Sequence, residues 1–376
     1  MSATRPRKIL YVQFTNPAGY PPLEHSSHIL AEEGWRVLFV GTEADSVSFP
    51  FHPHDNIQVR LQRFVPPGVF QKISYLWFLI RCLFWRFVFH PTVVYCSDPL
   101  SAPAGLLLGV FGSPVLYHEH DVPPVKVMNG LRRRLAKRAL ACILPQKERL
   151  RDFHEAMQPE QTFLVWNCPR RSDVVEKKRS RADDKLHLFY VGSLGPSLLP
   201  MVCVEALSRC GSNVFLHVVG YETAGTRGYA SQIREKAQAL GVSDQVELHG
   251  FRTRREFYRM ATAWDVGLSF ITPEVSNKNL QHLVGASNKF FDYLACGLLV
   301  VVPDSTEWKS LITPGYGISC PATPDDLAVV YKKLALDPSL CLSMGENGRQ
   351  RVLKDWNYET QFSPVKEMLE MKYPRN

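Results

Sequence analysis

The sequence predicts an α/β protein made of two facing, doubly wound Rossmann-like domains. Two observations support this. Short apolar runs alternate with helical stretches and end at glycine or polar turn residues, and a polar stretch at 171–185 interrupts the alternation once before it starts again. Strands that alternate with helices indicate parallel sheets with right-handed crossovers. The length of 376 residues also fits two domains.

The N-terminal half contains short apolar runs typical of strands buried on both faces. Gly34 stands where the first helix would end. We expect strands at 9–14, 35–40, 92–96 and 115–118, and helices at 24–33 and 102–109.

The alternation resumes in the C-terminal half. We expect strands at 186–191, 214–219, 245–248, 265–270 and 298–302, and helices at 200–209, 229–240, 254–262 and 288–295. These elements place an N-terminal domain at 1–170, a linker at 171–185 and a C-terminal domain at 186–355, with 356–376 packing back onto the first domain.

Charge is distributed unevenly along the chain. Residues 1–180 hold 23 Lys and Arg against 15 Asp and Glu, whereas residues 181–376 hold 21 of each. The basic half suits an anionic partner such as a membrane surface or a phosphorylated lipid, or it carries ordinary solvated charge. No nucleic-acid-binding module accompanies the basic clusters. Nine scattered cysteines, and no apolar leader before the first strand, predict a cytoplasmic protein with reduced thiols.

The segment 72–90, KISYLWFLIRCLFWRFVFH, is rich in aromatic and basic residues. Its longest uncharged run is about half of the ~20 residues that a membrane-spanning helix needs. Two interpretations remain, a helix lying at a membrane surface and a core helix whose arginines reach outward to water. We expect core packing on part of its face. The run LRRRLAKR at 131–138 either reinforces membrane contact or forms a solvated helix face.

The stretch 287–297, SNKFFDYLACG, has the composition of a helix start followed by a tight stop. The free N–H groups and the positive dipole at a helix N-terminus attract anions. Lys289 adds a full charge there, and Asp292 follows on the same side of the helix as Asn288 and Lys289. A capped amphipathic helix with an exposed Lys and Asp is the alternative.

Several motifs together carry a family resemblance. The run SNKFFDYLACGLLVVVPD is similar to the donor-binding signature of GT-B glycosyltransferases of the family 4, or group 1, type. FYVGSL and LHVVGYE resemble the glycine-ended strands that open the donor domain of this family, and VLYHEHD resembles its strand that ends in an acceptor-side histidine. The similarity covers most of residues 186–355 and is patchier before them.

The resemblance implies specific roles for residues of this chain. Asp292 matches the carboxylate that holds the nucleotide ribose, and His120 matches the histidine near the transferred sugar. With the helix start, the expected donor-binding residues are Gly192, Ser193, Gly220, Gly250, Phe251, Arg252, Asn288, Lys289 and Asp292. The expected acceptor-side residues are Asn16, Gly19 and His120, and the expected catalytic residues are His120, Asp121 and Lys289.

This chain departs from the family pattern at two places. Val284 stands where the family has the first Glu of a Glu–seven residues–Glu motif. The family also places an Arg and a Lys after the first donor glycine, whereas the stretch after Gly192, SLGPSLLP, has no cation. Lys289, Arg252, Arg254 or Arg255 would have to neutralise the diphosphate instead.

A metal site is not expected. His118 and His120 share one face of their strand while Glu119 points to the other, so the sequence HEHD offers only two imidazoles on one side. No Asp-x-Asp occurs, and the chain also lacks G-x-G-x-x-G, Walker A and G-x-S-x-G motifs.

The resemblance therefore implies a glycosyltransferase that moves a sugar from a nucleotide-diphosphate sugar to an acceptor hydroxyl. It implies retention of configuration and transfer without a metal, with the nucleotide sugar as co-substrate and no other cofactor. A sugar or lipid-linked acceptor and polysaccharide or glycolipid assembly fit the basic N-terminal half. Two alternatives remain, a non-catalytic sugar-nucleotide-binding partner subunit and a GT-B-fold nucleotide-sugar epimerase.

Overall fold

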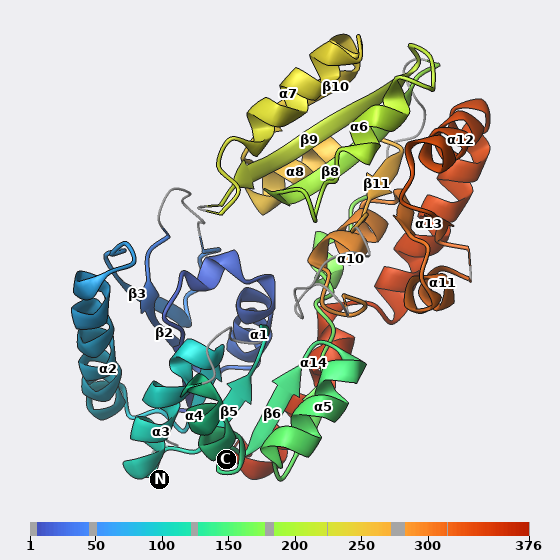
Figure 1. Ribbon diagram of the computed structural model, residues 1–376. Helices are drawn as coiled ribbons and strands as arrows, with labels where there is room; N and C mark the ends of the chain where they lie inside the picture. Colours follow the sequence, from blue (N-terminus) through green and yellow to red (C-terminus); the bar gives the residue numbers. More distant parts are fainter. Residues whose placement is uncertain are drawn as a thin grey trace. The chain divides into compact units, whose positions relative to one another are not determined.

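The computed structural model describes residues 6–44, 51–121, 127–176, 184–223, 225–271, 283–313 and 315–375. The chain divides into two compact units (Figure 1). Unit 1 comprises Met1–Asn167 and Tyr358–Asn376, and unit 2 comprises Cys168–Asn357. Each unit is described by itself below.

Unit 1 is built on a parallel sheet whose strand order is β3-β2-β1-β4-β5-β6-β7. This is the order of a doubly wound nucleotide-binding fold extended by one strand. The strands are β1 Lys8–Val12, β2 Arg36–Thr42, β3 Ile57–Gln62, β4 Val93–Ser97, β5 Val115–His118, β6 Ala141–Leu144 and β7 Thr162–Leu164. The order changes direction between β1 and β4, so the loops after these two strands lie at the switch point where such folds bind ligands.

Helices cover both faces of this sheet. α1 (Pro21–Glu32) and α14 (Tyr358–Lys372) pack on one face, where Tyr11 and Phe39 meet Phe362. Figure 1 shows the red α14 within the blue-to-green unit. The helices on the other face are α2 Val69–Phe89, α3 Ala102–Val110, α4 Val127–Ala136 and α5 Lys147–Met157.

Unit 2 repeats the same plan with a sheet of order β10-β9-β8-β11-β12-β13. The strands are β8 Leu186–Leu194, β9 Val214–Glu222, β10 Val246–Gly250, β11 Val266–Leu268, β12 Leu299–Pro303 and β13 Gly317–Cys320. All the pairs are parallel, with Gly192 of β8 opposite Gly220 of β9. The predicted pair of Rossmann-like domains is confirmed.

The helices of unit 2 also form two layers. One face is covered by α6 (Val202–Leu207), α7 (Tyr229–Ala239) and α12 (Pro324–Leu336). On the other face, Tyr293 of α10 (Asn288–Ala295) meets Phe189 of β8. The remaining helices are α8 Arg254–Ala261, α11 Thr306–Ile312 and α13 Pro338–Lys354.

The described part of the expected linker at 171–185 groups with unit 2. Residues 168–176 belong to unit 2, and the N–H of Val175 donates to the carbonyl of Ala295 in α10 over 3.1 Å. The described part of this polar segment is therefore hydrogen-bonded to unit 2. The part of this expectation at 177–183 lies outside the described residues.

Helix α2 packs only part of its surface into unit 1. Phe78 and Cys82 are fully buried against the sheet. The opposite side forms a stripe of nine apolar side chains that are between 49% and 77% exposed, here called the apolar stripe. Its members are Val69, Phe70, Ile73, Leu76, Trp77, Ile80, Phe84, Phe87 and Val88.

Several basic side chains of α2 and α4 are buried or half-buried. Arg81 and Arg86 of α2 are half-buried, and they donate to the carbonyls of Arg60 and Phe111. Arg132 of α4 is buried as well and pairs with a buried acid described below. The run at 131–138 is therefore not a uniformly solvated face.

Candidate functional site

The carboxyl ends of β8 and β9 approach one another unusually closely. A Cβ atom on Gly220 would lie 2.3 Å from the carbonyl oxygen of Gly192, so a side chain there would collide with the neighbouring backbone. Gly192 itself has a φ of +127°, which residues with side chains rarely adopt. Both predicted glycines are thus required by the backbone. Ser193, half-buried, follows Gly192 and accepts a hydrogen bond from Tyr190 through its carbonyl.

Lys289 occupies the space beside Gly192. Its Cε lies 3.2 Å from where a Cβ on Gly192 would stand. Its amine donates to the hydroxyl of Tyr190 over 2.8 Å and lies 4.4 Å from the centre of the same ring. Lys289 belongs to the first turn of α10, whose free N–H groups and dipole also favour an anion. A cation therefore sits at the glycine loop even though the loop sequence contains none.

Burial changes the chemistry of this amine. It lowers the pKa of Lys289 from 10.5 to about 7, because the protonated form loses solvation. Among the described residues, no carboxylate hydrogen-bonds to this amine, so an incoming anion would supply its counter-charge. Asn288, half-buried, is the first residue of the same helix.

Asp292 is held by two donors from α8. Arg254 pairs with both carboxylate oxygens, one of them over 3.1 Å, and the hydroxyl of Tyr258 donates to Oδ1 over 2.8 Å. Burial lowers the pKa of Arg254, but Asp292, Tyr258 and Asp173 together outweigh burial, so the pKa is raised. Ribose recognition by Asp292 stays a prediction, and a ribose would share this carboxylate with both donors.

The cations that could replace the missing Arg and Lys after Gly192 differ in their contacts. Arg254 does not offer a free charge to a phosphate, because it forms an ion pair with Asp292. Arg252 and Arg255 are exposed, and Arg252 donates to the carbonyl of Phe251. Lys289 is the one that the structure brings to Gly192.

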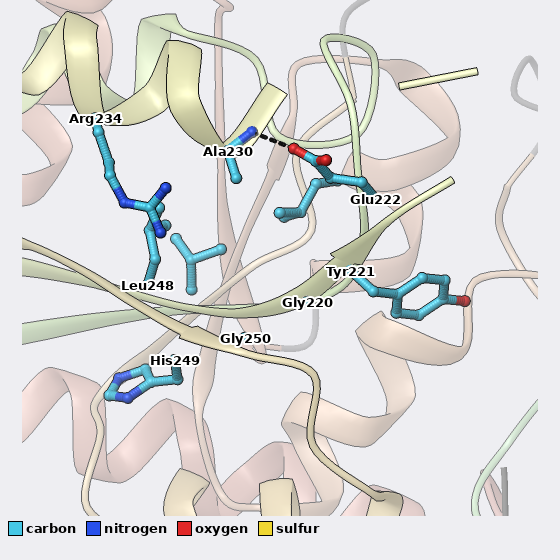
Figure 2. Close-up of a pocket in the computed structure, with 10 residues that line it drawn as sticks. Gly220, Tyr221, Glu222, Ala230, Arg234, Leu248, His249 and Gly250 are labelled. Atoms are coloured by element: carbon cyan, nitrogen blue, oxygen red, sulfur yellow. Dashed lines mark hydrogen bonds between the residues drawn. The ribbon is translucent and has the colours of Figure 1, made fainter. Parts of the chain in front are cut away.

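A pocket of about 300 Å³ opens between the ends of β9 and β10 and helix α7. Two predicted glycines line it, Gly220 and Gly250, the latter with φ +71°. Figure 2 shows Arg234 of α7 and the backbone of both strands around it, with Glu222 bonded to the N–H of Ala230. The other residues of its wall are Leu194, Val218, Tyr221, Leu248 and His249. Phe251 lies beyond the pocket and meets the ring of Tyr221 edge-on at 5.9 Å.

In unit 1, the side chains after β5 divide between two sides as the strand alternation predicts. The rings of His118 and His120 lie 3.8 Å apart, whereas Glu119 points away to a buried ion pair with Arg132 and a 2.7 Å hydrogen bond from Tyr117. Glu119 is therefore a structural residue, separated from the two imidazoles.

His120 is buried and carries an unused nitrogen. Its Nε2 has no hydrogen-bond partner within the described part of the chain. Burial, followed by the charge of Arg149, lowers its pKa to about 3, so the ring is neutral at pH 7. A neutral ring with so low a pKa is a weak base and a good hydrogen-bond partner, which favours positioning a hydroxyl over abstracting a proton.

Asp98 is a neighbour of His120 that the sequence did not indicate. It follows β4 with φ +67° and ψ 160°, a conformation that is strained for any residue with a side chain. Its Oδ1 accepts from the N–H of His120 over 3.1 Å, and its own N–H donates to the carbonyl of His118 over 2.8 Å. Burial, with help from the charge of Asp121, raises the pKa of Asp98 to about 8. Asp121 itself is exposed.

The predicted loop after β1 is a short 3-10 turn, Pro17–Gly19. Asn16 caps it, since its Oδ1 accepts from the N–H of Ala18 over 2.9 Å. Gly19 is exposed at the end of the turn, and the ring of the next residue, Tyr20, lies 5.5 Å from His120. The structure thus brings this loop beside His120, although the amide oxygen of Asn16 is already engaged.

Comparisons with known proteins identify the fold. Residues 204–368 match the family model described as glycosyl transferase-like. Sucrose-phosphate synthase from Thermosynechococcus elongatus superposes with a TM-score of 0.74 at 16% identity, covering 98% of this chain and 99% of that one. The protein has the GT-B glycosyltransferase fold. No curated protein matches the sequence.

Two further GT-B structures are similar over nearly the whole chain. HepE of Anabaena, solved with UDP and glucose, has a TM-score of 0.73 at 16% identity and covers 97% of this chain and 100% of its own. WaaG, a glycosyltransferase involved in lipopolysaccharide biosynthesis, has a TM-score of 0.68 at 13% identity, with 96% and 99% covered. These likenesses confirm the predicted GT-B fold. Within the described residues, no helix of this GT-B protein has the length and apolarity to cross a membrane.

Proposed function

We propose that this GT-B protein is a glycosyltransferase that transfers a sugar from a UDP-sugar to an acceptor hydroxyl, with retention of configuration and without a metal in the transfer step. The observation that carries the proposal is the amine of Lys289 beside Gly192, at the carboxyl edge of the sheet in unit 2. A buried amine at a glycine loop and a helix N-terminus is an arrangement suited to a diphosphate.

The donor class rests on the solved relatives. HepE binds UDP, UDP-glucose and UDP with glucose in its structures. By this likeness UDP is the nucleotide that we expect, and the pocket beside Gly220 and Gly250 offers room near the strand ends.

The transfer would proceed as follows. The bond between the sugar C1 and the β-phosphate oxygen breaks, and its electron pair goes to that oxygen. The acceptor oxygen forms the new bond to C1 on the same face, and its proton passes to the departing phosphate. Lys289, the N–H groups of the glycine loop and the α10 N-terminus stabilise the diphosphate charge as it develops. In unit 1, taken by itself, we propose that Nε2 of His120 holds a sugar hydroxyl.

One experiment separates this function from the two alternatives. Purified protein is incubated with a panel of nucleotide sugars, with and without membrane extract, and nucleotide release and sugar identity are followed by mass spectrometry. Nucleotide release that depends on the extract supports transfer. An isomerised donor sugar would instead identify an epimerase, and binding without turnover would identify a non-catalytic partner subunit.

The apolar stripe of α2 supports a membrane-presented acceptor. Exposed Trp, Phe, Leu and Ile side chains on one side of an amphipathic helix bind the headgroup boundary of a bilayer. The exposed Arg133 and Arg134 of α4, with Lys137 just after it, would attract anionic lipid. α4 packs against α3, which packs against α2, so all three lie on the same face of the sheet in unit 1.

We expect the triple variant Trp77→Ser, Ile80→Ser, Phe84→Ser to bind vesicles of phosphatidylcholine and phosphatidylglycerol about tenfold less tightly than the unchanged chain, because it removes apolar surface worth about 25 cal/mol per Å². Co-sedimentation measures the binding. The matched control is Val329→Ser, Leu336→Ser on α12, which removes apolar side chains that are 66% and 85% exposed. Equal vesicle binding by the two variants would remove α2 from the membrane contact.

A further inference from the structure

Three neighbouring strands of unit 2 each place a histidine on the same face of the sheet. His187 lies near the start of β8, His217 in the middle of β9, and His249 at the end of β10, where Glu247 joins them. The residues between them, such as Leu216 and Leu248, point to the opposite face, as the alternation of a strand requires. Topology thus gathers four metal-ligating side chains that are far apart in sequence.

The donor atoms of three of these residues have the spacing of a metal site. The Nδ1 of His217 is 3.2 Å from the Nε2 of His249 and 3.2 Å from an oxygen of Glu247. Metal–ligand bonds of about 2.0–2.1 Å in a tetrahedron place neighbouring ligand atoms about 3.3 Å apart. The candidate ligand atoms of the three residues all lie within 4.8 Å of one another. Little movement is needed to close them around one ion.

We propose that His217, Glu247 and His249 form a binding site for one divalent transition-metal ion, with zinc as the best match. Two imidazoles and one carboxylate are a ligand set that zinc accepts, and the fourth position would hold water. The site is separate from the proposed sugar transfer, which uses Lys289 and Gly192.

The pairing of β10 with β9 is irregular at His249. The pairing of β10 with β9 shifts between Leu248 and Gly250, so His249 is the extra residue of a β-bulge. Bulges are rare between parallel strands, and they re-aim a side chain. Figure 2 shows His249 on the opposite side of β10 from Arg234, so its ring points away from the pocket under α7.

His187 supports the site from behind. Its Nδ1 lies 2.9 Å from the Nε2 of His217. When His217 uses Nδ1 as a ligand, its Nε2 carries the proton, and His187 is placed to accept that hydrogen bond. A partner on the second nitrogen fixes the ring and its tautomer, as is usual for metal-binding histidines.

Trp264 covers the cluster and gives it a spectroscopic reporter. Its ring is stacked on His217 at 5.0 Å and lies 5.7 Å from His249. The side chains of His217 and His249 are 10% and 15% exposed, whereas that of Glu247 is 64% exposed. An ion would enter past the carboxylate into a site that is otherwise covered. Once bound, it would join β9 to β10 and hold the turn at Gly250.

The test uses the full-length chain without an affinity tag, freed of metal with a chelator. Calorimetric titration with Zn²⁺ should show one ion per chain, and titration with Co²⁺ should quench Trp264 fluorescence. Trp264→Phe should lose the quenching and keep the zinc. Failure of the unchanged chain to take up zinc would overturn the proposal, whatever the outcome of the nucleotide-sugar assay.

Variants assign the ligands. His217→Ala and His249→Ala should each weaken zinc binding about 100-fold. His187→Ala, which removes only the supporting hydrogen bond, should weaken it about tenfold. Glu247→Gln alters an exposed side chain, so it tests the site even where a histidine variant fails to fold. His154→Ala, on the exposed surface of α5 in unit 1, is the matched control and should bind zinc normally. Unchanged zinc affinity in both Glu247→Gln and His249→Ala would show that any zinc is held elsewhere, for example by thiols.

Discussion

Replacement of Lys289 by Ala should lower kcat/KM for the nucleotide sugar about 100-fold. Removal of one preorganised group that stabilises developing charge typically costs a factor of 10² to 10³ in rate. Lys289 is the cation that the structure brings to Gly192, and no Arg or Lys follows that glycine to share the task. Initial rates of nucleotide release measure the effect.

A matched control is available on another helix. Lys309→Ala on α11 removes an exposed lysine that pairs with Asp304, and it should leave the rate within twofold. If Lys289→Ala also stays within twofold, Lys289 has no part in the phosphate site.

The low pKa of Lys289 predicts how donor binding changes with pH. The amine of the free protein loses its proton around pH 7, and a bound diphosphate favours the protonated form. Donor affinity should therefore fall as the pH rises from 6 to 9, and Lys289→Ala should abolish this component of the dependence.

The same shift affects stability with a defined sign. Between about pH 7 and 10.5 the unfolded chain binds more protons at this residue than the folded chain, so the free energy of unfolding should increase with pH in this window. Below pH 7 both states carry the proton and the contribution is constant. Isothermal titration at several pH values, with urea unfolding of both proteins, measures the two effects.

Replacement of Arg254 by Ala should lower the free energy of unfolding of unit 2 by about 3–5 kcal/mol. The change leaves the carboxylate of Asp292, whose side chain is 5% exposed, without its charged partner, and an uncompensated buried charge carries a penalty of this size. Hydrogen exchange of the α10 amides, measured on the full chain, follows unit 2 separately from unit 1.

Two further variants test whether the loss comes from the unpaired carboxylate of Asp292. Arg349→Ala breaks a surface pair with Glu346 and should cost less than about 1 kcal/mol. The double variant Arg254→Met, Asp292→Leu removes both charges and should recover much of the loss, because two apolar side chains leave no buried charge unpaired. A cost for Arg254→Ala as small as that of Arg349→Ala would contradict our account of this pair.

The sequence was informative wherever a local pattern decides the structure. Strands such as Val115–His118, buried on both faces, read as continuous apolar runs and were placed correctly. By contrast, β3 at Ile57–Gln62 is half-exposed and polar at alternate positions, and β7 has only three residues, so neither has a clear apolar run. The sequence did not predict features that depend on tertiary contacts, such as the hydrogen bond between Val175 and α10.

The candidate sites likewise contain some residues that local sequence patterns indicated and others that they did not. Lys289 could be selected because a helix start and a missing loop cation are both local features. Tyr190 and Asp98 were missed, and Arg254 was named as a cation for the diphosphate rather than as the partner of Asp292, since these contacts depend on strand register and on backbone conformation. The histidine cluster carries a weak signal, a Leu-His pair in each of three successive strands of unit 2. That pattern has meaning only when the strand order is known.

The position of α14 has a consequence for biosynthesis. The last helix of the chain fills the core of unit 1, while unit 2 is a continuous insertion between the two parts of that unit. On the ribosome, unit 2 therefore has all of its residues before unit 1 does. The sheet of unit 1, which is translated before unit 2, must wait with part of the α1 face of its core uncovered until α14 has also been translated. Loss of α14 would consequently damage the unit whose sheet lies far before it in the sequence.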